Sequence, residues 1–217
     1  MIRSVVFDVG ETLIDETRIF ARWADRLGVP HLTLFGLIGA ALERGDSLTS
    51  AFRQVKPDFD LAAESANWRR DEPGSMRENF DAGDLYPDVR PALAALRDME
   101  LRVVIAGNQP TQAGAALRGM GLPTDGIHVS EDWGVAKPDP AFFARVQEET
   151  GTRPDEILYV GDRVDNDVLP AKEAGMAAAL LRRGMLGYRH ATHPGADRAD
   201  VVLDDLSQLV PWCAGRG

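Results

Sequence analysis

The stretch Ser4–Glu16, SVVFDVGETLIDE, contains the strongest indication of how this chain folds. Its apolar run Val5–Phe7 ends directly in a carboxylate, Asp8. A short apolar run of this kind is typical of a buried strand in a parallel sheet. Open α/β sheets bind their ligands outside the carboxyl ends of such strands. We therefore expect Asp8 to belong to a functional site.

The composition limits the kinds of partner that the chain can have. The 217 residues are 44% hydrophobic and 27% charged, with a net charge of −10. The composition indicates a globular protein, and the length is enough for one α/β domain and a smaller one. The negative charge argues against nucleic acid and anionic membranes as partners. The single cysteine, Cys213, excludes an intrachain disulfide. Because the sequence shows no long apolar span and no signal peptide, we expect a cytoplasmic protein of unknown oligomeric state.

Apolar runs and helical segments alternate along most of the chain. The expected strands are Ser4–Phe7, Leu101–Ala106, Gly126–Val129, Ile157–Val160, Ala177–Leu181 and Asp200–Leu203. The expected helices are Pro87–Asp98, Thr111–Met120, Pro140–Thr150 and Asp167–Ala174, several of them followed by a glycine suited to a helix C-cap. This alternation predicts an α/β fold with a Rossmann-like, doubly wound parallel sheet.

Residues 15–85 interrupt that alternation. Their apolar side chains recur at helical spacing, and the segment is far too long for an ordinary strand-to-helix connection. We interpret it as an inserted helical cap domain, with residues 1–14 and 86–217 forming the Rossmann-like core. The alternative is a set of helices that thickens one face of the sheet. The insertion point, directly after the Asp8 loop, favours the cap.

Polar residues follow four of the expected strands. The segments are Asp8–Thr12, Gly107–Gln109, Lys137–Pro140 and Gly161–Asp167. Because parallel strands end at one edge of a sheet, these groups can converge. The carboxylates of Asp8 and Asp162 are ligands that Mg²⁺ prefers, and an aspartate can also act as a nucleophile. Lys137 can neutralise clustered carboxylates and hold a phosphoryl group, while Asn108 and nearby backbone N–H groups can bind phosphate oxygens.

The four segments, taken together and in order, resemble the motifs of the haloacid dehalogenase-like (HAD) hydrolase superfamily. The residues that carry the resemblance are FDVGETL at Phe7–Leu13, GNQ at Gly107–Gln109, KPDPAFF at Lys137–Phe143 and GDRVDND at Gly161–Asp167. The resemblance covers nearly the whole chain. It implies a Mg²⁺-dependent hydrolase with a small helical cap inserted after the first motif.

The resemblance also implies roles for individual residues. Asp8 would be the nucleophile and a metal ligand, and Gly10 would reach the metal through its backbone carbonyl. Lys137 would be the catalytic lysine and, with Gly107 and Asn108, would bind substrate. Asp162 would be the acidic metal ligand of the fourth motif. Asp167 would be its second acid, supporting the lysine or the metal.

Two positions depart from the family pattern. Family phosphatases carry a second aspartate, the general acid/base, where this chain has Gly10, and loss of such a group typically costs about 10²–10⁴-fold in rate. The second motif usually begins with Ser or Thr, but here it begins with Gly107. Glu11 could substitute as the acid/base, or it could be a solvated loop carboxylate or one that bonds to backbone of the cap. We favour the second interpretation of Glu11.

These observations favour a phosphatase that hydrolyses a small phosphorylated metabolite through an aspartyl-phosphate intermediate, with weak turnover. One alternative is a catalytically reduced member that binds a phosphorylated ligand or a protein partner. Another is a metal-independent 2-haloacid dehalogenase, because dehalogenases also lack the second aspartate. The acidic pattern of Gly161–Asp167 and the absence of an aromatic residue at position 10 count against the dehalogenase.

Overall fold

The chain divides into two compact units. The structure, a computed structural model, describes residues 1–76 and 79–215. Met1–Asp15 and Asp81–Gly217 form one unit, which we call the core unit, and Glu16–Phe80 form the other, the helical unit. The inserted segment therefore runs from residue 16 to residue 80, whereas the sequence pattern suggested 15–85. The physical reason is that the backbone N–H of Asp15 donates to the carbonyl of Asp84 and Ile14 pairs with Leu85, which ties residues 81–85 to the core.

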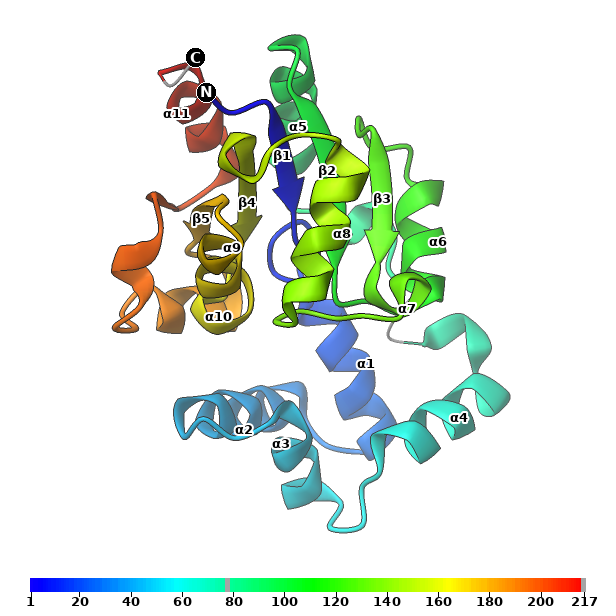
Figure 1. Cartoon of the computed structure of the whole chain (residues 1–217). Coiled ribbons are helices and arrows are strands. Elements are labelled where there is room, and N and C mark those ends of the chain that lie inside the picture. The colour runs from blue at the N-terminus through cyan, green and yellow to red at the C-terminus, as the bar shows by residue number, and fades with distance from the viewer. Residues whose placement is uncertain (77–78, 216–217) are drawn as a thin grey trace. The chain divides into compact units, whose positions relative to one another are not determined.

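A parallel sheet organises the core unit. Among the described residues it has six strands in the order β3-β2-β1-β4-β5-β6, all paired in parallel (Figure 1). The strands are β1 Ser4–Phe7, β2 Arg102–Gly107, β3 Gly126–Val129, β4 Ile157–Gly161, β5 Ala177–Leu181 and β6 Val201–Leu203. The Rossmann-like α/β fold is thus confirmed. Strand β1 lies between β2 and β4, where the direction of strand addition reverses and such sheets bind their ligands.

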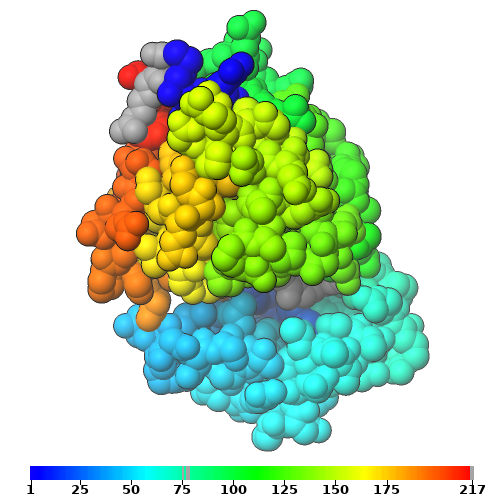
Figure 2. All heavy atoms as spheres, viewed as in Figure 1, coloured from blue at the N-terminus to red at the C-terminus, as the bar shows by residue number. Residues whose placement is uncertain are grey.

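Helices cover both faces of the sheet. On one face, α8 (Pro140–Thr150) and α9 (Leu169–Glu173) form a buried cluster with strand residues such as Val104 and Tyr159. In Figure 2, drawn from this side, the yellow-green and yellow atoms of these helices hide most of the sheet. The helix expected over Asp167–Ala174 is shorter, because a π-helical turn, Val164–Val168, precedes α9. Helix α5 (Val89–Asp98) packs against β2 and α11 (Leu209–Ala214) and lies behind the sheet in Figure 1.

Short elements complete the core unit. The remaining helices are α6 Thr111–Gly119, α7 Ser130–Trp133, α10 Gly184–His190 and α11 Leu209–Ala214. Single 3₁₀ turns lie at Ala82–Asp84, Pro154–Glu156, Ala196–Arg198 and Leu206–Gln208. In the described chain, no helix combines the length and the apolar character needed to cross a membrane.

The helical unit has an aromatic core of its own. Its helices are α1 Thr17–Leu27, α2 His31–Glu43, α3 Leu48–Val55 and α4 Leu61–Asp71, with a 3₁₀ turn at Pro73–Ser75. The Trp23 ring lies edge-on to the rings of Phe52, Phe59 and Trp68, at centroid distances of 5.4, 5.7 and 4.6 Å. Aromatic pairs at such distances add stability beyond the burial of their area. Trp23 and Trp68 therefore serve packing in this unit.

Candidate active site

Three buried carboxylates meet at the carboxyl edge of the sheet. Asp8 follows the end of β1, Asp162 follows the end of β4, and Asp167 lies in the π-helical turn behind Asp162. One carboxylate oxygen from each residue lies within 4.8 Å of the other two. The strand ends thus bring together the acidic residues that the motif pattern singled out.

The ammonium group of Lys137 lies between two of these carboxylates. Its Nζ is 2.5 Å from Asp8 Oδ1 and 2.6 Å from Asp167 Oδ1, and the residue is buried. The same Nζ lies 5.3 Å from the ring centroid of Tyr159 and 5.9 Å from that of Phe142, on the negative faces of two aromatic rings. The ion pair between Asp167 and Lys137 is thus direct. The two aromatic rings lie beside it and shield it from water.

The cluster has three carboxylates and one ammonium group, and this imbalance shifts the pKa values of its members. Burial, together with the charges of Asp167 and Asp8, raises the pKa of Asp162 well above its usual range. Burial also raises the pKa of Asp167, to about 6, although Lys137 opposes the shift. For Lys137, burial alone would lower the pKa, but the charges of Asp167 and Asp8 override it and raise the pKa well above its usual range. The lysine therefore stays charged, and the carboxylates lack enough positive charge to balance them.

This donor set fits a divalent cation. Three closely spaced carboxylates and one ammonium leave excess negative charge in a buried place, and hard oxygen ligands of this kind suit Mg²⁺. A bound cation would remove the mutual repulsion that raises the carboxylate pKa values. Asp8 and Asp162 would hold it, because both oxygens of Asp167 are engaged, Oδ1 by Lys137 and Oδ2 by the backbone N–H of Arg163 at 3.0 Å, whereas Lys137 contacts Asp8 through Oδ1.

Two hydrogen bonds join the second motif segment, Gly107–Gln109, to the third, which begins at Lys137. The Asn108 side-chain amide donates to the Lys137 carbonyl at 2.8 Å, and the Lys137 backbone N–H donates to Asn108 Oδ1, also at 2.8 Å. Asn108 thus acts first as a support for Lys137. A Cβ added at Gly107 would lie 2.8 Å from Asp8 Oδ1, so the missing side chain makes room for the carboxylate.

The Asp8 loop has no carboxylate at position 10, and the one at position 11 is engaged elsewhere. Gly10 is half-buried. The Tyr86 hydroxyl donates to Glu11 Oε2 at 2.5 Å. A Cβ added at Gly184 would overlap the Glu11 carboxylate, so the first residue of α10 packs directly against this side chain. Glu11 is therefore a buried carboxylate bonded to a tyrosine side chain, and our expectation of a solvated loop carboxylate is wrong.

Several contributors to the site carry no motif signal. His190 is buried, and its Nδ1 accepts from the backbone N–H of Val164 at 3.1 Å, which fixes the turn between Asp162 and Asp167. Nothing in the sequence indicates this contact, because His190 lies 26 residues from Val164 and outside the four motif segments. Asp165, in the same turn, pairs with Arg163 at 2.6 Å. The π-helical turn Val164–Val168 has Arg163 as its N-cap residue, so this ion pair joins the cap residue to the first part of the turn.

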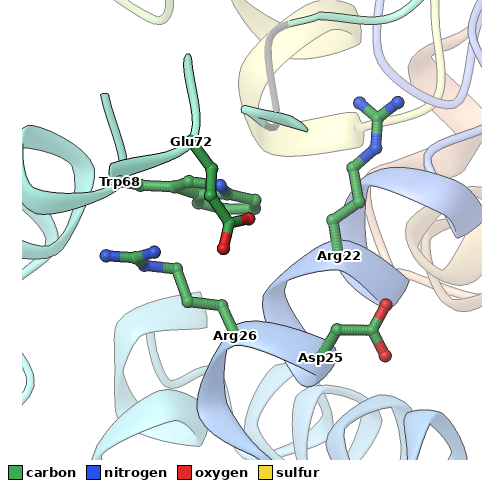
Figure 3. A pocket seen from close by; sticks show the side chains of 5 residues that line it. All are labelled: Arg22, Asp25, Arg26, Trp68 and Glu72. Carbon is green, nitrogen blue, oxygen red and sulfur yellow. The ribbon is translucent and has the colours of Figure 1, made fainter. Parts of the chain in front are cut away.

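A separate cavity lies inside the helical unit. It has a volume of about 330 Å³ and is lined by Arg22, Asp25, Arg26, Trp68 and Glu72 (Figure 3). Arg22 donates to the carbonyls of Met76 and Asn79 at 3.1 and 3.0 Å, and Arg26 pairs with Asp71 at 3.0 Å. The arginines and the carboxylates that line this cavity give it no excess charge of either sign.

Comparison with known proteins agrees with the fold and the site. The sequence matches the family described as haloacid dehalogenase-like hydrolase over residues 2–175. It is 39% identical to a glyceraldehyde 3-phosphate phosphatase of Methanopyrus kandleri, with 85% of each chain covered. It is 30% identical to a phosphoglycolate phosphatase of Pseudomonas putida, over 98% of this chain and 80% of the relative.

A solved structure described as a predicted phosphoglycolate phosphatase from Haemophilus somnus has the same fold, with a TM-score of 0.72 at 21% identity over 98% of both chains. The parallel sheet and the carboxylates at the ends of its central strands agree with an α/β hydrolytic enzyme of the HAD type, which the sequence matches identify. The chain belongs to the haloacid dehalogenase-like hydrolase family and is a hydrolase.

Proposed function

We propose that this protein is a Mg²⁺-dependent phosphatase that hydrolyses a small phosphate monoester through an aspartyl-phosphate on Asp8. The observation that carries the proposal is the buried cluster of Asp8, Asp162 and Asp167 around Lys137. The names of two relatives that align over most of their length, both phosphatases of small phosphorylated compounds, support it. The net charge of −10 also suits a small-molecule partner better than nucleic acid.

In the first step, a carboxylate oxygen of Asp8 attacks phosphorus while the bond to the leaving oxygen breaks in line. Lys137 faces the negative charge on the phosphoryl oxygens, and Asp167 holds its ammonium in place. Backbone N–H groups of the Gly107–Asn108 loop bind the same oxygens. Asp8, Asp162 and the Gly10 carbonyl would hold Mg²⁺, which would supply further positive charge there when bound.

In the second step, water attacks the aspartyl-phosphate, the bond between phosphorus and the Asp8 oxygen breaks, and orthophosphate leaves. Both steps need proton transfer at the leaving or attacking oxygen, which Gly10 cannot provide. We therefore propose that protons come from water or from the substrate, and that turnover is slow. We further propose that the helical unit is the cap that selects the substrate, and that the protein works in the cytoplasm.

The test is hydrolysis of a generic aryl phosphate by the full chain, with and without Mg²⁺. We expect phosphate release that requires the metal and disappears in Asp8→Asn, with Asp58→Asn, an exposed aspartate of the helical unit, as the matched control. Absence of turnover over a broad panel of phosphate esters, despite bound Mg²⁺, would instead indicate a member that only binds its ligand. Metal-independent release of halide from 2-haloacids would indicate a dehalogenase.

A further inference from the structure

Glu11 combines a left-handed backbone with a buried carboxylate. Its φ is 51°, and only 8% of its surface is exposed. Residues with a Cβ adopt this backbone conformation only when their surroundings hold them there. The contacts of the Glu11 side chain and backbone must therefore stabilise this conformation.

Tyr86 is the partner that holds the Glu11 side chain. Its hydroxyl donates to Oε2 at 2.5 Å, and the backbone of Gly184 packs against the same carboxylate. Burial, followed by the hydrogen bond to Glu11, raises the pKa of Tyr86 above its usual range, so the hydroxyl remains a donor. The Arg183 guanidinium lies 4.2 Å from the centroid of the Tyr86 ring.

This tyrosine is itself fixed by the rest of the core unit. Arg183 forms a bidentate pair with Asp88 and donates to the carbonyl of Thr12 at 3.3 Å. Asp88 also accepts from the backbone N–H of Leu206 at 2.7 Å. The Glu11–Tyr86 pair is therefore anchored to the Asp8 loop, to the loop after β5 and to the turn before α11.

The backbone hydrogen bonds show what the pair controls. The N–H groups of Leu13 and Ile14 donate to the Val9 carbonyl at 2.8 and 3.0 Å, and the Leu13 carbonyl accepts from Tyr86 at 3.0 Å. The Glu11 N–H donates to the Ile14 carbonyl at 2.8 Å. Because a trans peptide points its N–H and C=O in opposite directions, that bond sets the direction of the Gly10 carbonyl.

These hydrogen bonds fix the residues that follow Glu11. A change in the φ of Glu11 would therefore have to rotate the peptide between Gly10 and Glu11. We propose that Tyr86 and Glu11 are positioning residues for metal binding, which hold the Gly10 carbonyl in the direction that a cation in the Asp8–Asp162 cluster requires. The inference rests on the proposed function, because it takes the cluster to be a Mg²⁺ site.

The test measures the Mg²⁺ dissociation constant of the full chain by calorimetry. We expect Tyr86→Phe to weaken Mg²⁺ binding by about 10-fold or more, as is typical when a group that orients a metal ligand is lost. Glu11→Gln keeps an oxygen acceptor for the Tyr86 hydroxyl and should bind Mg²⁺ nearly as tightly as the unaltered chain. Tyr188→Phe, an exposed tyrosine, is the matched control.

A double variant separates positioning from general damage to the fold. Glycine adopts positive φ freely, so Glu11→Gly in the Tyr86→Phe background should restore most of the lost affinity. If Tyr86→Phe binds Mg²⁺ like the unaltered chain, or if the double variant is as weak as Tyr86→Phe, the proposal is wrong. It is also wrong if Glu11→Gln abolishes turnover while leaving the Mg²⁺ dissociation constant unchanged, because Glu11 would then transfer a proton. If the unaltered chain binds no Mg²⁺, the proposed metal site itself fails.

Discussion

The side chain of Asn108 and the backbone of Lys137 bind each other through two hydrogen bonds of 2.8 Å, one in each direction. This reciprocal contact joins the loop after β2 to the segment before α8. It places the lysine so that its Nζ reaches Asp8 and Asp167. The position of the only cation in contact with these carboxylates in the described chain thus depends on a neutral amide.

Replacing the Asn108 side chain should lower the rate of phosphate ester hydrolysis. We expect Asn108→Ala to decrease kcat by about 100-fold, because misplacing a catalytic group by about 1 Å can cost that much. Steady-state kinetics with an aryl phosphate checks this, and Asn67→Ala on α4 serves as the control. A kcat equal to that of the unaltered chain would show that Lys137 keeps its place without Asn108.

Removing the lysine should destabilise the metal-free protein. Lys137→Met leaves buried carboxylates without their ammonium, and breaking a buried ion pair in this way costs about 3–5 kcal/mol. Lys172→Met, which removes a partly exposed pair with Asp200, should cost about 1 kcal/mol or less. Urea unfolding with chelator present measures both free energies. Equal losses would contradict the view that the buried cluster is held together by Lys137.

Stabilisation by Mg²⁺ should depend on pH. The metal-free carboxyl of Asp167 has its pKa raised from 3.8 to about 6, so the folded chain binds more protons than the unfolded chain between these values. Stability without metal should accordingly fall as the pH rises through that range. The pKa of Asp162, a proposed ligand in the same cluster, is also raised well above its usual range. Mg²⁺ must compete with the proton on that carboxyl, so its effect on Tm should be large at pH 7.5 and small at pH 5.

Thermal unfolding at both pH values, with ionic strength matched by NaCl, tests this dependence. Asp162→Asn should abolish most of the Mg²⁺ effect at pH 7.5. Equal Tm increases at pH 5 and pH 7.5 would show that protons and Mg²⁺ do not share these carboxylates.

Restoring the usual hydroxyl of the second motif should not help this enzyme. A Cβ at Gly107 would lie 2.8 Å from Asp8 Oδ1 and 3.0 Å from Val9 Cγ2, and Lys137 holds the Asp8 oxygen in place. We therefore expect Gly107→Ser and Gly107→Ala to lower kcat alike. A Gly107→Ser variant that is faster than the unaltered chain would mean that Asp8 can move without loss.

Restoring the missing acid/base should have the opposite effect. We expect Gly10→Asp to raise aryl phosphatase turnover at least about tenfold, since a positioned general acid/base typically contributes about 10²–10⁴-fold. The control is the double variant Gly10→Asp with Asp8→Asn, which should be inactive. No increase in turnover would show that proton transfer is not what limits this protein.

The sheet and the meeting of the motif residues could be predicted from sequence for a simple reason. Buried parallel strands such as Ile157–Gly161 are continuous apolar runs, and the residues after them share one edge. Asp8, Lys137 and Asp162 could therefore be expected to lie together before any coordinates were known. The roles of these residues in metal binding and catalysis stay predictions until the measurements above are made.

The supporting contacts could not be predicted in this way. Tyr86 and Glu11 are 75 residues apart, and their bond depends on the path of two loops that no periodic pattern describes. The contact of His190 with the backbone of Val164 depends on a π-helical turn, which has no sequence signal of its own. Both are determined by tertiary packing, which the local sequence does not record.

The hydrogen bond from Asp15 to Asp84 means that the chain leaves the sheet and returns to it at almost the same point. A segment with adjacent ends can change its length or its sequence without forcing the strands to rearrange. Evolution could therefore replace the whole segment between Asp15 and Asp84 with another one. A descendant with a new segment at this position would keep the sheet, the buried carboxylates and Lys137 unchanged.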